Sequence, residues 1–164
     1  MRTKKYAQLH SGMSVVEIII ASAIISLSMI SIAVVYGNFI SLSTQNTAKV
    51  QAAFLLDEGV EAIKTMRGEK WTNIASTTAS TTYYFIWQTD KWRATTTPAV
   101  IDKIFIRTFV VSPVYRDVST FNILPNTSGT LDPGTKKVDI TVKWPEKGAT
   151  STRTTSMYIF NLYE

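Results

Sequence analysis

The sequence predicts an α+β fold, in which one long N-terminal helix packs on a C-terminal antiparallel sheet. Three observations lead to this prediction. Residues 18–36 are apolar and uncharged, apolar residues then recur at helical spacing as far as Met66, and beyond residue 82 the pattern changes to alternation with period two. A helix followed by strands that are linked by turns is the α+β arrangement.

The first element is a short basic leader, residues 1–12, which contains Arg2, Lys4 and Lys5 and ends at Gly12. In an ordinary secretory signal the cleavage site follows the apolar region, which is then discarded. Here the glycine precedes the apolar region. A cut after Gly12 would therefore leave the hydrophobic helix on the mature protein.

The second element is an apolar helix over residues 13–36, whose uncharged part runs from Ile18 to Tyr36. As a helix this part spans roughly 28 Å, close to the hydrocarbon core of a bilayer. Basic residues before it, and none in the dozen residues after it, predict a cytoplasmic leader and an external C-terminal part. Four serines interrupt it, and they either let helices approach closely or bond back to helix carbonyls: Ser22, Ser26, Ser28 and Ser31.

Glu17 is the single charge between Met13 and Tyr36. A carboxylate costs roughly 2.5–3.5 kcal/mol at the centre of a membrane helix and less near its end, so this one needs a partner or a function. No basic residue lies between Glu17 and Lys49. A cut after Gly12 would create a new amine on Met13, only four residues away.

The third element, residues 37–68, is expected to continue the helix in amphipathic form. Its charged residues lie mainly on other faces, where we expect them to be solvated, and Gly68 can supply a left-handed cap at its end. The apolar stripe that should cover the sheet consists of Ala53, Leu56, Val60, Ile63 and Met66, widened by Phe54.

Residues 69–164 form the predicted β-rich domain. Residues 72–82 are dominated by Thr, Ser and Ala and predict a loop, and turns are expected at 132–134 and 145–148. Strands are expected at 83–87, 103–111, 138–144 and 153–162. The clearest pattern is the alternation of Val138, Ile140, Val142 and Trp144 with polar residues, which predicts a half-buried strand facing the helix.

Composition excludes several classes of function. The chain has no Cys, and its one histidine, His10, lies in the leader, so a mature chain could build neither a Ser-His-Asp triad nor a usual zinc site. We therefore expect no enzyme, no cofactor and no metal. The chain has 17 basic and 12 acidic residues. Three of the basic residues lie in the leader, so the mature chain would have 14 basic residues and a net charge of only +2, which argues against a specific nucleic-acid partner.

Two weaker candidate sites remain. Trp92, between Lys91 and Arg93, is the best candidate for an exposed aromatic side chain. Asn126-Thr127-Ser128 fits an N-glycosylation acceptor, a motif that is common by chance.

The order Gly12, Met13, Ser14, Glu17, behind a basic leader and before a spanning helix, resembles the cleavage and methylation signature of type IV pilins and pseudopilins. Two further features resemble those of minor pilins and pseudopilins. They are the C-terminal hairpin around Trp144 and the lack of a proline in the apolar helix. The resemblance implies a pilin-like fold, cleavage between Gly12 and Met13, and N-methylation of Met13. It also implies that Glu17 pairs with the N-terminal amine and sets the register of assembly.

The same resemblance implies the partners and the location. The partners are other pilin subunits, a prepilin peptidase and methyltransferase, and an inner-membrane assembly platform. The location is the bacterial cytoplasmic membrane, with a single pass and an external C-terminal domain, and then a surface pilus or a secretion pseudopilus.

Two alternatives stay open. The chain can be a signal-anchored cell-surface binding module that never polymerises, which an intact residue 1–12 segment on the mature protein would favour. It can also be a tethered enzyme, which hydrolytic activity of the external domain would favour.

Overall fold

The computed structural model describes residue 12, residues 14–125 and residues 127–162. One long helix, α1 (Val15–Glu69), comes first, and a single turn of helix, α2 (Thr72–Ala75), follows it. Seven strands complete the chain: β1 (Thr82–Gln88), β2 (Lys91–Thr95), β3 (Val100–Ile101), β4 (Phe105–Arg116), β5 (Ile123–Leu124), β6 (Thr130–Glu146) and β7 (Ala149–Phe160). The predicted α+β layout is confirmed.

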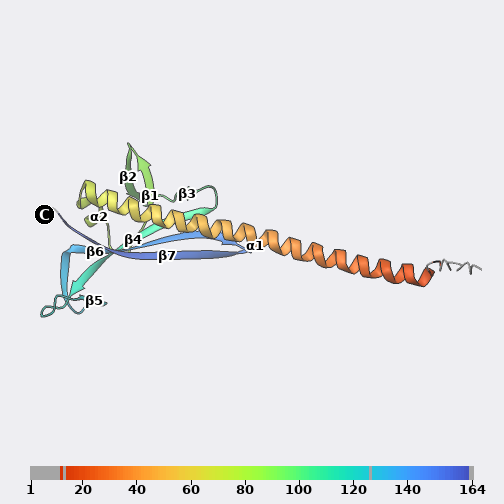
Figure 1. Cartoon of the computed structure of the whole chain (residues 1–164). Coiled ribbons are helices and arrows are strands. Elements are labelled where there is room, and N and C mark those ends of the chain that lie inside the picture. Colours follow the sequence, from red (N-terminus) through yellow and green to blue (C-terminus); the bar gives the residue numbers. More distant parts are fainter. Residues whose placement is uncertain (1–11, 13, 126, 163–164) are drawn as a thin grey trace, which may run out of the picture. The chain divides into compact units, whose positions relative to one another are not determined.

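The strands form one antiparallel sheet in the order β2-β1-β4-β6-β7, and the short strands β3 and β5 pair with β4 (Figure 1). The centre of the sheet is the long pair β4–β6, and β7 is paired with β6 along its whole length. The sequence had indicated four strands, and it missed β2, β3 and β5. A two-residue strand is shorter than any window in which period-two alternation can be recognised.

The chain divides into two compact units, with the boundary between Thr44 and Gln45. In the second unit, the last part of α1 packs on the sheet. Its buried residues are Ala52, Leu56, Gly59, Ala62, Ile63 and Met66. They meet a sheet face formed by buried Phe109 and Val111 on β4 and by Val138, Ile140, Val142 and Trp144 on β6. All four predicted core residues of β6 are therefore confirmed.

The helix stripe was predicted about one residue out of phase at several positions. Ala53 and Val60 are only half-buried, and Phe54 is 68% exposed and does not widen the stripe. Small residues occupy the contact instead, because a large side chain would push the helix away from the sheet. At Gly59, an added Cβ would lie 3.0 Å from Cγ2 of Ile140.

The predicted end of the helix, near Arg67 and Gly68, agrees to within two residues with the observed end at Glu69, but Gly68 lies inside the helix without a left-handed conformation and does not cap it. The predicted loop at 72–82 begins with α2 and ends in β1. The predicted turn at Asp132-Pro133-Gly134 lies inside β6, where the register with β4 shifts between Pro113 and Val114. These turn-forming residues occupy an irregularity within the strand instead of a turn. A strand irregularity is one of the few places where a sheet accommodates proline.

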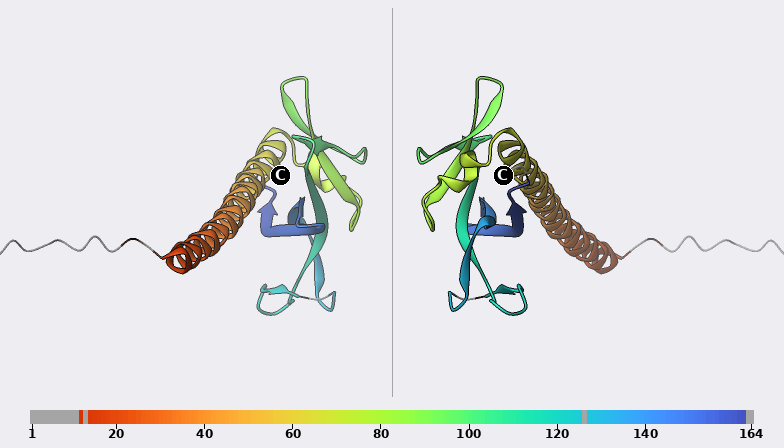
Figure 2. Two further views of the ribbon diagram at one scale, coloured as in Figure 1. Left: turned by 90° about the vertical axis from the view of Figure 1, so that its right-hand side faces the viewer. Right: turned by 90° about the vertical axis from the view of Figure 1, so that its left-hand side faces the viewer.

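The predicted turn after Trp144 is confirmed and is tighter than expected. Glu146 pairs with Ala149, so the β6–β7 hairpin turns on Lys147 and Gly148 alone. Both have positive φ, 50° and 78°, as a type I′ turn requires. Figure 2 shows the loops next to β5 and the β1–β2 hairpin at opposite ends of the sheet.

Candidate assembly site

The start of α1 brings Gly12, Ser14 and Glu17 into one short segment. The carbonyl of Ser14 accepts hydrogen bonds from the backbone N–H groups of Glu17, at 3.0 Å, and Ile18, at 3.2 Å. Ser14 thus stands immediately before the helix, and Glu17 is its third residue. This is the Ser-x-x-Glu spacing of a capping box, and a carboxylate in the first turn also interacts favourably with the helix dipole.

The described residues give no reason for a glycine at position 12. No described residue lies within 4 Å of the position that a Cβ would occupy, and Gly12 does not have positive φ. Neither close packing nor left-handed backbone requires glycine at this position. Met13, the predicted site of cleavage and methylation, lies outside the described residues, as do residues 1–11.

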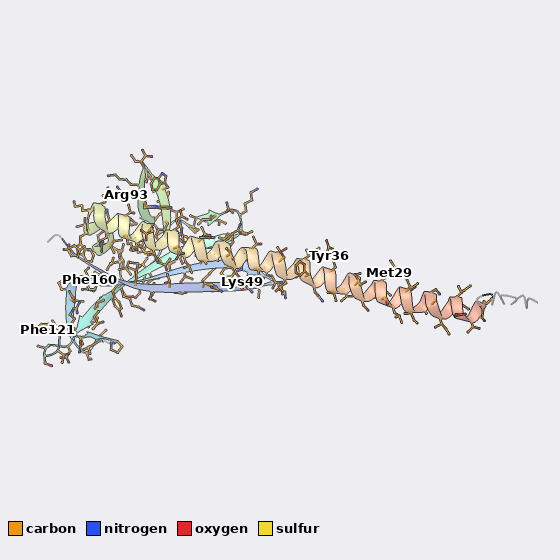
Figure 3. The ribbon with its side chains drawn as sticks, viewed as in Figure 1. Met29, Tyr36, Lys49, Arg93, Phe121 and Phe160 are labelled. Atoms are coloured by element: carbon orange, nitrogen blue, oxygen red, sulfur yellow. The ribbon has the colours of Figure 1, made fainter. Side chains whose placement is uncertain are left out.

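The helix after Glu17 exposes its large apolar side chains on all sides. From Val15 to Leu42 they are between 49% and 72% exposed, and Figure 3 shows Met29 and Tyr36 among them. Among the described residues, α1 is the one helix that is long and apolar enough to cross a membrane. Such a surface is unfavourable in water, at about 25 cal/mol for each Å² of apolar area.

The serines of the apolar segment bond back to their own helix. Ser22 Oγ donates to the carbonyl of Ile19 at 2.9 Å, and Ser26, Ser28 and Ser31 donate to the carbonyl four residues earlier at 2.8–2.9 Å. The second of the two sequence-based alternatives is therefore shown. The hydroxyl protons are satisfied inside the helix, so these serines add little penalty in an apolar environment.

The outer part of α1 carries acidic residues, and two of them bind the sheet. Glu58 accepts a hydrogen bond of 2.7 Å from Nη1 of Arg107, whose side chain is 3% exposed. Arg107 Nη1 also donates to the carbonyl of Leu55 at 3.0 Å. The sequence predicts that Glu58 is solvated, and it gives no sign of a buried Arg107, because an arginine in a strand pattern normally marks the solvent face. Glu61 and Lys64 form the predicted helix pair, at 2.7 Å.

The second acidic residue, Glu69, ties the end of α1 to β2. It binds Arg93 and Lys91, the latter at 2.6 Å. Hydrogen bonds from Arg93 and Lys91 lower the pKa of Glu69 to about 2. Trp92, between these two basic residues, is not the exposed aromatic side chain that the sequence predicts. Trp92 packs partly buried against Phe85, and the exposed tryptophan of the hairpin is Trp87, at 57%.

Other sequence-based candidates are not brought together into a site. The described residues contain no group of three or more His, Asp or Glu side chains that could hold a metal ion. Asn126 of the glycosylation motif lies outside the described residues. In comparisons with known proteins, no family model, no curated protein and no solved structure matches this chain.

Proposed function

We propose that this chain is a structural subunit of a filament similar to type IV pili or secretion pseudopili, made as a prepilin. The observation that carries the proposal is the exposed apolar helix that directly follows Gly12, Ser14 and Glu17. It is continuous with a helix whose outer part packs on an antiparallel sheet. This order of parts serves a protein that keeps its hydrophobic segment after losing its leader.

The exposed apolar segment needs two successive environments in this proposal. Before assembly it lies in the bacterial cytoplasmic membrane as a single pass, with the sheet domain outside. After assembly it packs against the same segment of other subunits. Its satisfied serine hydroxyls support both states, because neither lipid nor a helix bundle offers water to an unpaired donor.

The proposal assigns the N-terminal residues separate roles. A prepilin peptidase cuts between Gly12 and Met13, and a methyltransferase modifies the new amine of Met13. Gly12 supports the first role, since the fold itself gives no reason for a glycine there. Glu17 pairs with the Met13 amine of an incoming subunit, which removes two charges from an apolar environment and fixes the axial register. The other partners are an inner-membrane assembly platform and further pilin subunits.

The test is the intact mass of the protein from membranes of its native host. Loss of residues 1–12 together with the gain of one methyl group is the expected result. Gly12→Val should accumulate the uncut precursor. Gly37→Val is the matched control, because Gly37 also has no neighbour within 4 Å of a Cβ, and it should be processed normally.

An uncut wild-type N-terminus would overturn the proposal. That result would favour the second candidate, a signal-anchored surface module that never polymerises.

A further inference from the structure

Two apolar side chains stand in water on the loop that joins β4 to β5. Val118 is 76% exposed and Phe121 is 71% exposed, the highest values among large hydrophobic residues described between 45 and 162. A single exposed apolar residue is ordinary. Two on one short loop, called here loop 117–122, form a potential contact surface, because an aromatic side chain can bury 150–250 Å² in a contact.

The loop is held in one conformation by the side chain of Asp117. Its Oδ1 accepts hydrogen bonds from the backbone N–H of Ser119 at 2.8 Å, from the hydroxyl of Ser119 at 2.6 Å and from the backbone N–H of Thr120 at 2.8 Å. The hydrogen bonds from Ser119 and Thr120 lower the pKa of Asp117 to about 2, so the carboxylate is charged at neutral pH. Oδ2 accepts no hydrogen bond from the described part of the chain.

Backbone contacts fix the other half of the loop. Phe121 N–H donates to the carbonyl of Asp117 at 3.0 Å, and Arg116 Nη1 donates to the carbonyl of Phe121 at 2.9 Å. Arg116 is itself held by Asp132 at 2.6 Å. Phe121 has a φ of 58°, which is rare for a bulky residue. The loop thus presents its apolar side chains with little conformational entropy left to lose on binding.

A groove with complementary character lies at the other end of the same strand. It has a volume of about 560 Å³, and its lining includes Ile104, Ile106, Lys143, Pro145, Thr150 and Thr152. Ile106 and Lys143 belong to the sheet face turned away from α1, because they alternate with the buried residues Phe105 and Val142, and the almost fully buried Trp144 also lines the groove. Lys143 has no ion-pair partner among the residues that the structure describes.

Strand β4 connects the two features. It starts at Phe105 beside the groove and ends at Arg116 beside the loop, a distance of roughly 35–40 Å at strand spacing. Figure 3 places Phe121 at the end of the sheet domain opposite to Lys49, which pairs at 3.0 Å with Glu146 near the groove. Loop 117–122 and the groove therefore cannot meet within one molecule.

We propose that loop 117–122 of one copy docks into this groove on a second copy of the chain, with Phe121 against Ile104 and Ile106. The free oxygen of Asp117 faces the unpaired ammonium of Lys143 in this contact. A contact between two different surfaces leaves one of each free at the ends of the pair, so further copies can add; the series closes into a ring if the rotation between copies closes, and otherwise it stays open, as a filament needs. The inference rests on the proposed filament function and identifies one contact between the sheet domains of neighbouring subunits.

The test uses crosslinking in the full-length chain, which is free of cysteine. Thr120→Cys and Thr152→Cys place one thiol on the loop and one in the groove, and both leave Phe121 and Ile106 in place. In native-host membranes, a short thiol-to-thiol crosslinker should give a ladder of dimers, trimers and higher multimers. Either substitution alone should give at most dimers. The control pair Thr96→Cys with Thr152→Cys, which places an exposed threonine of another loop in the same experiment, should give no ladder.

Two further variants on the Thr120/Thr152 background test the contacts themselves. Phe121→Ser should abolish the ladder, and Lys143→Met should reduce it by about two- to fivefold, the effect of losing an exposed ion pair. Both residues are exposed, so neither change alters the core. An absent ladder, a ladder of equal strength in the control pair, or a ladder unchanged by Phe121→Ser would overturn the inference.

The outcome is separable from that of the proposed function. Wild-type chain recovered in sheared filaments without a Thr120–Thr152 ladder would overturn only the inference. A ladder in a host that makes no filaments would support the contact and overturn the filament proposal.

Discussion

The guanidinium of Arg107 lies beneath α1 and donates a hydrogen bond of 2.7 Å to the carboxylate of Glu58, which is itself 48% exposed. The rings of Phe85 and Trp92 lie 4.9 Å and 5.3 Å from the guanidinium carbon. One buried positive charge is thus neutralised from the rim of the helix and covered by two aromatic faces. The contact links the helix to the sheet in one defined geometry, which non-directional apolar packing alone would not provide.

Replacement of Glu58 should test this contact. Glu58→Ala leaves the buried guanidinium with the carbonyl of Leu55 as a hydrogen-bond acceptor, and we expect it to cost about 1–3 kcal/mol in the free energy of unfolding. Glu61→Ala is the matched control, because it removes an exposed helix pair worth about 0.3–0.5 kcal/mol. Urea unfolding of residues 45–164 measures both. Equal losses would mean that the Arg107 pair adds nothing beyond a surface pair.

Residues 45–164 should fold without the apolar segment. The buried residues of α1 and the sheet that they cover all belong to this part of the chain. A soluble fragment should give a cooperative thermal transition and a far-ultraviolet spectrum with both helix and strand content. A fragment that starts at Gly68, after the last buried helix residue, is the control and should not fold. If both fragments unfold alike, the helix does not cover the sheet.

Trp144 should be the most costly single truncation on β6. It is 3% exposed and packs near Phe105, with ring centroids 6.4 Å apart. Trp144→Ala should cost about 3–5 kcal/mol as a large-to-small core substitution. Trp144→Phe should cost less, because the indole Nε1 has no hydrogen-bond partner among the described residues. Phe54→Ala, at an exposed helix position, should leave the stability within about 0.5 kcal/mol of wild type.

The pH dependence of stability should report the salt bridge of Glu69 with Arg93 and Lys91. The pKa of Glu69 falls from an ordinary value of 4.5 to about 2 on folding. Its contribution is therefore fully present above pH 4.5 and is lost as the pH falls towards 2. The difference in stability between wild type and Glu69→Gln should shrink across this window. Replacing Lys91 and Arg93 together by Met should remove the same pH dependence; if the dependence persists, another group causes it.

Glu17 can act through its charge or through the geometry of the helix start, and two substitutions separate these roles. Pairing with the Met13 amine needs a carboxylate, so Glu17→Ala and Glu17→Gln should both be cleaved and inserted but poorly incorporated into filaments. A capping box accepts Gln as well as Glu. Normal incorporation of Glu17→Gln, with loss for Glu17→Ala, would assign Glu17 to helix capping. Immunoblots of sheared filaments and of membranes measure the two populations.

The sequence alone determined the parts of this protein that carry a long, uninterrupted pattern. The uncharged apolar run from Ile18 to Tyr36 is long enough to span a membrane, and the alternation of Val138, Ile140, Val142 and Trp144 extends over several periods, so they identified the long helix and the central strand. Gly12 and Glu17 could be recognised for another reason. Gly12 precedes the apolar run, where a secretory signal has its cleavage site after the run, and Glu17 is the single charge between Met13 and Tyr36.

Only the tertiary structure decided which residues face one another. Arg107 occupies a core position because Glu58, 49 residues earlier in the chain, neutralises it. Gly59 replaces a large apolar residue because Ile140 lies so close to the helix. Loop 117–122 and the groove near Ile106 could be related to each other only from the structure, in which β4 places them at opposite ends of one sheet. These relationships depend on distances across the fold, and local spacing in a sequence contains no record of such distances.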